Sequence, residues 1–294
     1  MSIRFRRNSL WLLFTQLRPV QWTKNTLVLA ALIFTIPRVS VAMLEKTIAA
    51  FILFSLVSSC VYILNDFIDL EVDCNNPDKR HRPMASGRLD IRLALGCGFF
   101  LLLLSLILGF TLNAWFGVAL IGYFMINVVY SLWLKNIVVI DIFTIAAGFV
   151  LRAAAGGFVI SVRLTPWFLS CAMMLSLFLA TGKRKYEYMI WHKGNAASRR
   201  VLEQYSPELL NQLSSVTAAS VIMMYSMFTF SSGHSQYLMM TIPLVMYGIF
   251  RYFQLMHVEN QGGRPEIVLV KDKYILGTVV LFTVMVITLL YCFG

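Results

Sequence analysis

Charged side chains are scarce in this sequence. Asp, Glu, Lys and Arg make up 13% of its 294 residues, whereas hydrophobic residues make up 59% and the mean hydropathy is +0.73. Because a soluble domain carries roughly a quarter charged residues, this composition excludes one and indicates an integral membrane protein. A spanning helix takes about 20 residues, so the length leaves no room for a large soluble domain. We therefore expect residues 1–294 to form a single polytopic membrane domain.

Cysteine and histidine patterns that bind metals are also lacking. No two cysteines form a CxxC pair and no histidine stands at zinc-finger spacing, which excludes a zinc finger and a disulfide framework. Acids are fewer than bases, 14 against 25. In a membrane protein this excess is first explained by basic cytoplasmic loops, so no nucleic-acid partner is expected. The five cysteines are Cys60, Cys74, Cys97, Cys171 and Cys292.

Long apolar stretches dominate what is present. Bounded by charges, proline or glycine, they predict an all-α bundle of nine transmembrane helices. Three arginines near the N-terminus, ahead of the short apolar run from Leu10 to Phe14, predict an interfacial helix rather than a signal peptide. The expected spans are 26–39, 47–65, 91–112, 115–134, 137–160, 165–181, 211–230, 237–255 and 274–292.

The basic residues predict the orientation of the spans. Most Lys and Arg fall in alternate connections, and the positive-inside rule places these connections in the cytoplasm. The N-terminus is then cytoplasmic and the C-terminus lies outside. Only Arg38, Lys46 and Arg163 fall in the outer connections, and Arg152 falls within a span.

Acidic residues gather after the second expected span. Asp66, Asp69 and Asp73 have the i, i+3, i+7 spacing that places side chains on one helical face. Converging carboxylates repel one another and need cations, and a hard divalent ion, Mg²⁺ or Mn²⁺, suits them. Asn65 adds a polar ligand at membrane depth, where polar groups are typically functional. The alternative is a solvated acidic cap paired with nearby arginines.

A basic run, Lys79-Arg80-His81-Arg82-Pro83, follows a turn at 75–77. The turn can fold Arg80 and Arg82 back over the carboxylates. Carboxylates that hold a metal beside arginines that bind oxyanions are what a diphosphate or phosphosugar requires. The alternative is that these bases only obey the positive-inside rule.

The segment Asn65-Asp66-x-x-Asp69-x-x-x-Asp73 resembles the first Asp-rich motif, NDxxDxxxD, of the UbiA superfamily of intramembrane prenyltransferases. Nine spans with cytoplasmic active-site loops are also typical of that superfamily. Its second motif ordinarily carries another Asp-rich set for a second Mg²⁺. This chain has Gly182-Lys183-Arg184-Lys185-Tyr186-Glu187 there, without an Asp.

In this second motif the chain resembles the decaprenyl-phosphate phosphoribosyltransferase subgroup. Members of that subgroup transfer phosphoribose from 5-phosphoribosyl 1-diphosphate (PRPP) to a polyprenyl phosphate. Other matching stretches, in the same order, are Arg18-Pro19, Gln21 to Asn25, Lys79 to Pro83, Tyr130-Ser131 with Lys135, Asp141 with Arg152-Ala153, Gly156-Gly157, and Gly263 to Ile267 ahead of Asp272.

The resemblance implies a Mg²⁺-dependent enzyme of the bacterial inner membrane with its active site facing the cytoplasm. Asp66, Asp69 and Asp73 would be the catalytic metal ligands, and no general base is obligatory because the lipid phosphate is already anionic. The substrate-binding residues implied are Lys24, Asn65, Lys79, Arg80, Arg82, Tyr130, Lys135, Asp141, Arg152, Lys183, Arg184 and Glu187.

Several of these roles have alternatives. Arg152 lies deep in the fifth expected span, where it contacts substrate or forms a buried pair with a carboxylate. Asp141 is a structural cap or pair, or a ligand, and Lys135 is a topology signal or a phosphate contact. Glu187 orients a Lys or Arg, or joins the metal. Small residues from Gly148 to Gly157 favour close helix packing, which allows a homo-oligomer.

Two other functions remain open from the sequence. One is transfer of an isoprenoid chain from a prenyl diphosphate to an aromatic or other acceptor, favoured by the first motif and disfavoured by the missing second Asp cluster. The other is ion or lipid transport, which only the polytopic plan supports.

Overall fold

A computed structural model describes residues 2–76, 79–192, 200–233, 235–258, 263 and 265–293. This part of the chain contains helices and no strand, which confirms the all-α prediction. The α-helices are α1 (Ser2–Gln16), α2 (Ala30–Ile33), α3 (Val41–Ile68), α4 (Leu70–Asn75), α5 (Ile91–Leu112), α6 (Ala114–Leu132), α7 (Ile140–Val159), α8 (Pro166–His192), α9 (Pro207–Ser231), α10 (Ile242–His257), α11 (Pro265–Lys271) and α12 (Lys273–Phe293). Four 3-10 helices join them: η1 (Pro19–Leu29), η2 (Leu134–Asn136), η3 (Arg200–Gln204) and η4 (Gln236–Thr241).

Eight helices of the described chain are long and apolar enough to cross a membrane, so the protein is multi-pass. Seven of them are α3, α5, α6, α7, α8, α9 and α12, and the eighth is η4 continued by α10. Each coincides with one expected span. The α8 helix runs further than expected, to His192, because the basic sequence after Gly182 remains helical.

The first expected span, 26–39, is not a transmembrane α-helix. Its residues lie in the last part of η1, in the four-residue α2 and in a turn. Val28 and Ala31 of this segment are buried in the core, and the residue before it anchors η1. Asn25 is fully buried and donates from Nδ2 to the hydroxyls of Ser55 and Ser58 on α3, at 3.1 Å each. These bonds hold η1 against α3.

The main core lies between η1, α3, α6 and α7. Val28, Phe54, Phe116, Leu120 and Ala155 are among its buried residues. Close packing here depends on glycine: a Cβ at Gly156 on α7 would lie 2.1 Å from the carbonyl oxygen of Val28. The small side of α7 therefore serves helix packing within the bundle, as the sequence suggested.

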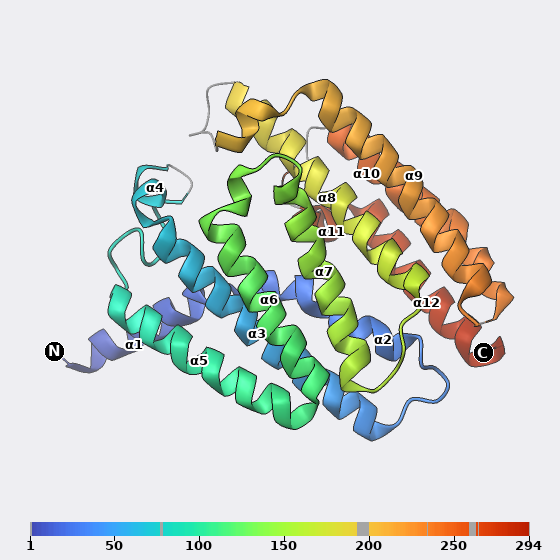
Figure 1. Cartoon of the computed structure of the whole chain (residues 1–294), viewed down its shortest axis with the longest axis horizontal. Coiled ribbons are helices and arrows are strands. Elements are labelled where there is room, and N and C mark those ends of the chain that lie inside the picture. Colours follow the sequence, from blue (N-terminus) through green and yellow to red (C-terminus); the bar gives the residue numbers. More distant parts are fainter. Residues whose placement is uncertain are drawn as a thin grey trace.

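Three connections lie at the same end of the bundle. Figure 1 shows that α4, the α6–α7 connection and the α8–α9 connection gather at the upper end, while the C-terminus lies at the lower right. The α1 helix packs beside this bundle and leaves Leu10 69% and Trp11 63% exposed, which suits the interfacial helix predicted from the sequence.

Candidate functional site

The acidic motif is divided between two helices. Asp66 lies in the last turn of α3, Asp69 caps that helix with φ −92° and ψ 10°, and Asp73 lies in α4. The expectation of one continuous helical face is therefore wrong, because the chain bends at Asp69. Asp66 and Asp73 nonetheless face the same centre and are only 2% and 1% exposed.

Arg82 joins these two carboxylates. Its Nη1 donates to Asp66 Oδ1 at 2.9 Å and also to Asp73 Oδ2. The predicted return of the basic run over the carboxylates is thus confirmed for Arg82. Arg80 is exposed, and Asp78, which belongs to the acidic run, lies outside the described residues.

The N-terminal segment supplies two further partners of Asp66. Arg18 Nη2 lies 2.5 and 2.6 Å from its two oxygens, and Gln16 Nε2 donates to Oδ2 at 2.7 Å. Arg18 has a left-handed backbone, φ 53°, directly before Pro19. Neither Arg18 nor Gln16 was predicted to lie in the site. The matching Arg18-Pro19 stretch was a signal for Arg18, whereas no sequence pattern pointed to Gln16.

Two lysines and an amide complete the cluster. Lys135, from η2, donates to Asp69 Oδ1 at 2.6 Å, and Lys79 Nζ lies 3.3 Å from Asp73 Oδ1. Asn65 Oδ1 accepts a hydrogen bond from the hydroxyl of Ser131 on α6 at 3.0 Å. Four cations thus surround three carboxylates. The positive charges outnumber the negative ones, which suits the binding of an anion.

The carboxylate oxygens of Asp66, Asp69 and Asp73 are of the kind that binds a hard divalent cation. In this structure most of them are paired with basic residues. Within the described residues, no three His, Cys, Asp or Glu side chains lie together closely enough to hold a metal. Asp73 Oδ1 is buried without a hydrogen bond, since Lys79 at 3.3 Å lacks the geometry for one. That orphaned oxygen suits a hard divalent cation.

A second cluster surrounds Arg184, which is 1% exposed. Its Nε donates to Asp141 Oδ2 at 2.5 Å, its Nη1 to Glu187 Oε2, and its Nη2 to the Tyr130 hydroxyl at 3.1 Å. Asp141 is fully buried and accepts a further bond from the Tyr205 hydroxyl at 2.7 Å. Asp141 and Glu187 both pair with Arg184, the contacts expected of a structural pair and of an orienting carboxylate, while their roles toward substrate stay predictions.

The remaining predicted phosphate contacts differ in access. Lys183 is 41% exposed and lies 4.0 Å from Glu187 Oε1. Lys24 is half-buried in η1. Because each guanidinium nitrogen of Arg184 already donates to the protein, Lys183 is the more accessible cation of the GKRxxE segment, and a phosphate role for Arg184 stays a prediction.

Arg152 is buried in α7 away from both clusters. It donates from Nε to Asn25 Oδ1 and from Nη2 to the Tyr123 hydroxyl, at 2.7 Å each. Its guanidinium lies 4.7 Å from the ring centroid of Tyr123 and 4.8 Å from that of Phe149. Of the two alternatives, the pair with a carboxylate is not formed within the described residues, where an amide, a phenol and aromatic faces stabilise this charge.

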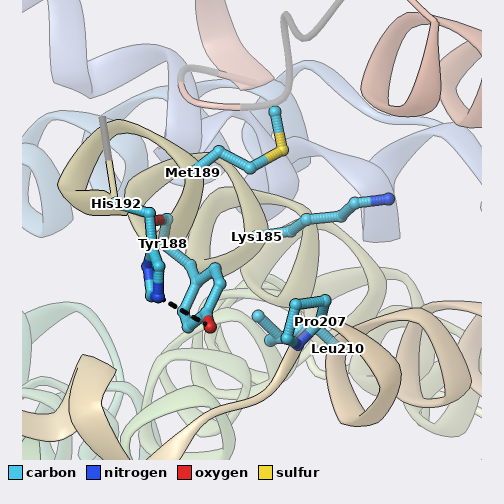
Figure 2. Close-up of a pocket in the computed structure, with 6 residues that line it drawn as sticks. All are labelled: Lys185, Tyr188, Met189, His192, Pro207 and Leu210. Atoms are coloured by element: carbon cyan, nitrogen blue, oxygen red, sulfur yellow. Dashed lines mark hydrogen bonds between the residues drawn. The ribbon is translucent and has the colours of Figure 1, made fainter.

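A cavity of about 340 Å³ lies on another side of α8. Figure 2 shows its lining from α8 and from the start of α9, with the Tyr188 hydroxyl hydrogen-bonded to His192 Nε2 at 3.1 Å. Among the residues that the structure describes, its walls contain no carboxylate. The lining residues are Lys185, Tyr188, Met189, His192, Pro207 and Leu210.

The sequence model of the UbiA prenyltransferase family matches residues 25–268. The chain belongs to this family. The match includes the acidic motif and the Arg184 cluster, so the resemblance based on Asn65, Asp66, Asp69 and Asp73 is confirmed, and with it the prediction of a transferase enzyme.

Several curated relatives of this UbiA family member are named decaprenyl-phosphate phosphoribosyltransferase. This chain is 36% identical over 271 residues to a decaprenyl-phosphate phosphoribosyltransferase of Corynebacterium glutamicum, and the match covers 87% of this chain and 80% of the relative. A protein of the same name from Mycolicibacterium smegmatis is 32% identical, with 89% and 86% covered. The GKRxxE segment suggested the decaprenyl-phosphate phosphoribosyltransferase subgroup, and these two relatives carry that name.

Solved structures have the same fold. A UbiA homolog from Archaeoglobus fulgidus bound to DMAPP and Mg²⁺ superposes with a TM-score of 0.72 at 19% identity, covering 95% of this chain and 98% of that one. A UbiA homolog from Aeropyrum pernix gives 0.68 at 12% identity, with 92% and 96% covered. These similarities establish a UbiA-type bundle.

Proposed function

We propose that this protein transfers 5-phosphoribose from PRPP to a long-chain polyprenyl phosphate of the decaprenyl type and releases diphosphate. The observation that carries the proposal is the unequal make-up of the two clusters. One cluster offers three carboxylates ringed by four cations, whereas the other has, among the described residues, only two acids, and both are bonded to the buried Arg184. A donor with one diphosphate and a separate phosphate matches one metal-binding cluster plus additional cations. The names of the curated relatives support the same substrates.

The basic residues divide between binding and orientation. Arg18, Lys79, Arg82 and Lys135 lie at the carboxylates and are the cations available to a donor diphosphate. Lys183, Lys24 and Arg80 are candidates for the 5-phosphate and the lipid phosphate. The side chain of Asn65 lies at the same end of α3 as these carboxylates, and the hydrogen bond from the Ser131 hydroxyl holds it in place.

The transfer needs little proton chemistry. An oxygen of the lipid phosphate bonds to the anomeric carbon while the bond from that carbon to the diphosphate breaks, and the diphosphate leaves with the electron pair. A Mg²⁺ ion, or Mn²⁺, held by Asp66, Asp69 and Asp73 would neutralise the charge that develops on the leaving group. Because the attacking phosphate is anionic at neutral pH, no general base is required.

We also propose that nine segments cross the bacterial inner membrane, with the N-terminus and the site on the cytoplasmic side. The Arg18–Asp66 contact supports this, because α3 begins at Val41 and ends beside Arg18. The chain between Arg18 and Val41 then has to travel the length of α3. The η1 and α2 helices together rise about 28 Å, close to the thickness of the hydrocarbon core.

The test supplies purified protein in detergent with Mg²⁺, decaprenyl phosphate and radiolabelled PRPP. We expect a phosphoribosylated lipid, identified by mass, and release of diphosphate. Asp66→Asn should abolish both products. Glu71→Gln is the matched control, because Glu71 is an exposed acid of α4 between Asp69 and Asp73, and it should remain active. Formation of product without dependence on Asp66 would contradict the assignment of the site.

Prenyl transfer is the second candidate, favoured by the fold shared with a structure that holds DMAPP and Mg²⁺. The same assay is run with a labelled prenyl diphosphate and a panel of aromatic acceptors. A prenylated acceptor together with no product from PRPP would replace the first proposal by this one.

A further inference from the structure

The start of α7 contains a strained turn. Val139 has φ 70° and ψ −46°, and the Ile140 amide donates to the carbonyl oxygen of Val138 at 2.8 Å. This geometry is a γ-turn of the rare form, in which the central residue has a positive φ. A β-branched residue is especially unfavourable there, so the surrounding structure must hold the turn in place.

The side chain of Tyr205 keeps the turn in place through two hydrogen bonds. The Tyr205 hydroxyl accepts the Val139 amide hydrogen at 2.9 Å and donates its own hydrogen to Asp141 Oδ1 at 2.7 Å. The first bond holds the central residue of the turn, and the second holds Asp141, the second residue of α7. Burial raises the pKa of the Tyr205 phenol, and the hydrogen bond to Asp141 raises it further, so the hydroxyl stays protonated and remains a donor.

The ring of Tyr205 is fixed independently of the hydroxyl. Tyr205 follows η3 and is 4% exposed, packed with Val201 and Leu210. Tyr188 and Val138 pack at the edge of the same group. The α8–α9 connection thereby presents a rigid hydroxyl to the α6–α7 connection, and the two connections lie at the same end of the bundle in Figure 1.

The strained turn separates the two functional clusters. Lys135, four residues before Val139, reaches Asp69 of the acidic motif, and Asp141, two residues after it, binds Arg184. The turn therefore sets where η2 ends and α7 begins. A relaxed turn would shift Lys135 relative to Asp69 even though neither residue contacts Tyr205.

We propose that Tyr205 is a positioning residue for donor binding: its hydroxyl holds the Val139 turn and so places Lys135 at the acidic cluster. This inference rests on the proposed function only where Lys135 meets the donor diphosphate. The hold on the turn is a property of the protein alone, and it can be measured without substrate.

Tyr205→Phe tests the proposal because it keeps the packed ring and removes only the hydroxyl. We expect the KM for PRPP to rise about tenfold, as for one lost hydrogen bond to a charged group, while kcat changes less than about threefold. Tyr188→Phe is the matched control, since it removes another hydroxyl from the same packed group and should leave both constants unchanged. An unchanged KM in Tyr205→Phe overturns the proposal.

Rescue separates positioning from a general loss of structure. Glycine adopts a positive φ without steric cost, so Val139→Gly keeps the turn without help from Tyr205. Val139→Gly alone should behave like the unmodified protein, and Tyr205→Phe combined with Val139→Gly should recover most of the lost donor affinity. Failure of the second substitution to lower the raised KM overturns the role assigned to the turn.

Hydrogen exchange of the substrate-free protein gives the independent measurement. In Tyr205→Phe the amides of 136–141 should exchange at least tenfold faster, whereas Tyr188→Phe should not alter them. Unchanged exchange overturns the proposal. If the unmodified protein makes no product from PRPP, the proposed function fails, and the exchange result still decides whether Tyr205 holds the turn.

Discussion

Lys135 Nζ lies 2.6 Å from Asp69 Oδ1, although 66 residues separate the two in sequence. The contact joins η2, between α6 and α7, to the bend between α3 and α4. Both side chains retain some exposure, 18% and 20%, so an entering anion can reach the ammonium group. The α6–α7 connection is therefore part of the acidic site and not only a link between two spans.

Lys135→Met should lower kcat/KM for PRPP by about tenfold or more, because a charge-assisted contact to the diphosphate is lost. Lys135→Arg should retain an intermediate rate, since the charge remains. Lys46→Met, at the exposed start of α3, is the control. Initial rates over a range of PRPP concentrations measure the effect, and equal rates in all three variants would exclude Lys135 from the site.

Arg82→Gln should separate metal binding from catalysis. Without the guanidinium that joins them, the Asp66 and Asp73 carboxylates repel each other and bind a cation more readily. We expect Mg²⁺ to raise the thermal midpoint of this variant at about tenfold lower concentration, while phosphoribosyl transfer is strongly reduced.

Arg88→Gln serves as the control for that experiment, because Arg88 bonds Ser86 and the His81 carbonyl and not the carboxylates. It should leave both Mg²⁺ dependence and activity unchanged. A weaker Mg²⁺ response in Arg82→Gln than in the unmodified protein would contradict the expected competition.

The pair of Asp141 and Arg184 should behave as a buried ion pair. Asp141→Leu leaves the 1% exposed guanidinium without its fully buried carboxylate partner and should cost about 3 kcal/mol of unfolding free energy. Adding Arg184→Met removes the under-compensated buried charge and should restore much of that loss. Unfolding in detergent measures the cycle, and additive effects of the two substitutions would contradict a direct coupling.

We expect Asn25 to stabilise the fold by accepting a hydrogen bond from the buried guanidinium of Arg152. Asn25→Leu removes the acceptor of Arg152 Nε from a fully buried position and should destabilise the protein by roughly 3 kcal/mol. Asn25→Asp keeps an acceptor and adds a counter-charge, so it should be much less destabilising. The thermal midpoints of the two variants provide the comparison, and the reverse order would show that Arg152 does not depend on this acceptor.

The pair of Arg251 and Asp272 predicts a dependence of stability on acid. The hydrogen bond from Arg251 Nη2, at 2.6 Å, holds the pKa of Asp272 below its ordinary value. A carboxyl with a lowered pKa contributes stability above its unfolded pKa and loses that contribution as the pH falls through the folded value. Asp272→Asn should therefore lower the thermal midpoint at pH 7, and the difference should vanish in strong acid. A constant difference at every pH would contradict this origin.

The spans were predictable because a membrane imposes length and hydropathy on each crossing helix. Eight expected stretches became such helices, and their ends moved by only a few residues except at the start of α3 and at the end of α8. The segment at 26–39 is not one long α-helix, and hydropathy does not register the contact beside it, in which Asn25 bonds Ser55 and Ser58 on another helix.

The local chemistry of the site was also present in the sequence. The spacing of Asp66, Asp69 and Asp73 indicated a cation-binding cluster, and the nearby turn indicated the return of Arg82. Residues close in sequence can meet through one helix or one turn, so their spacing carries this information.

The tertiary structure decided which distant side chains complete each cluster. Packing brought Gln16 and Arg18 to Asp66, Lys135 to Asp69 and Tyr205 to Asp141, and it gave Arg184 two carboxylates within the protein. The sequence by itself determined a UbiA-type membrane bundle with an acidic site, because periodicity, hydropathy and local motifs are encoded along the chain. Partner choice depended on helix packing in three dimensions, because a buried charge is stabilised by whichever polar group the fold brings within hydrogen-bonding distance.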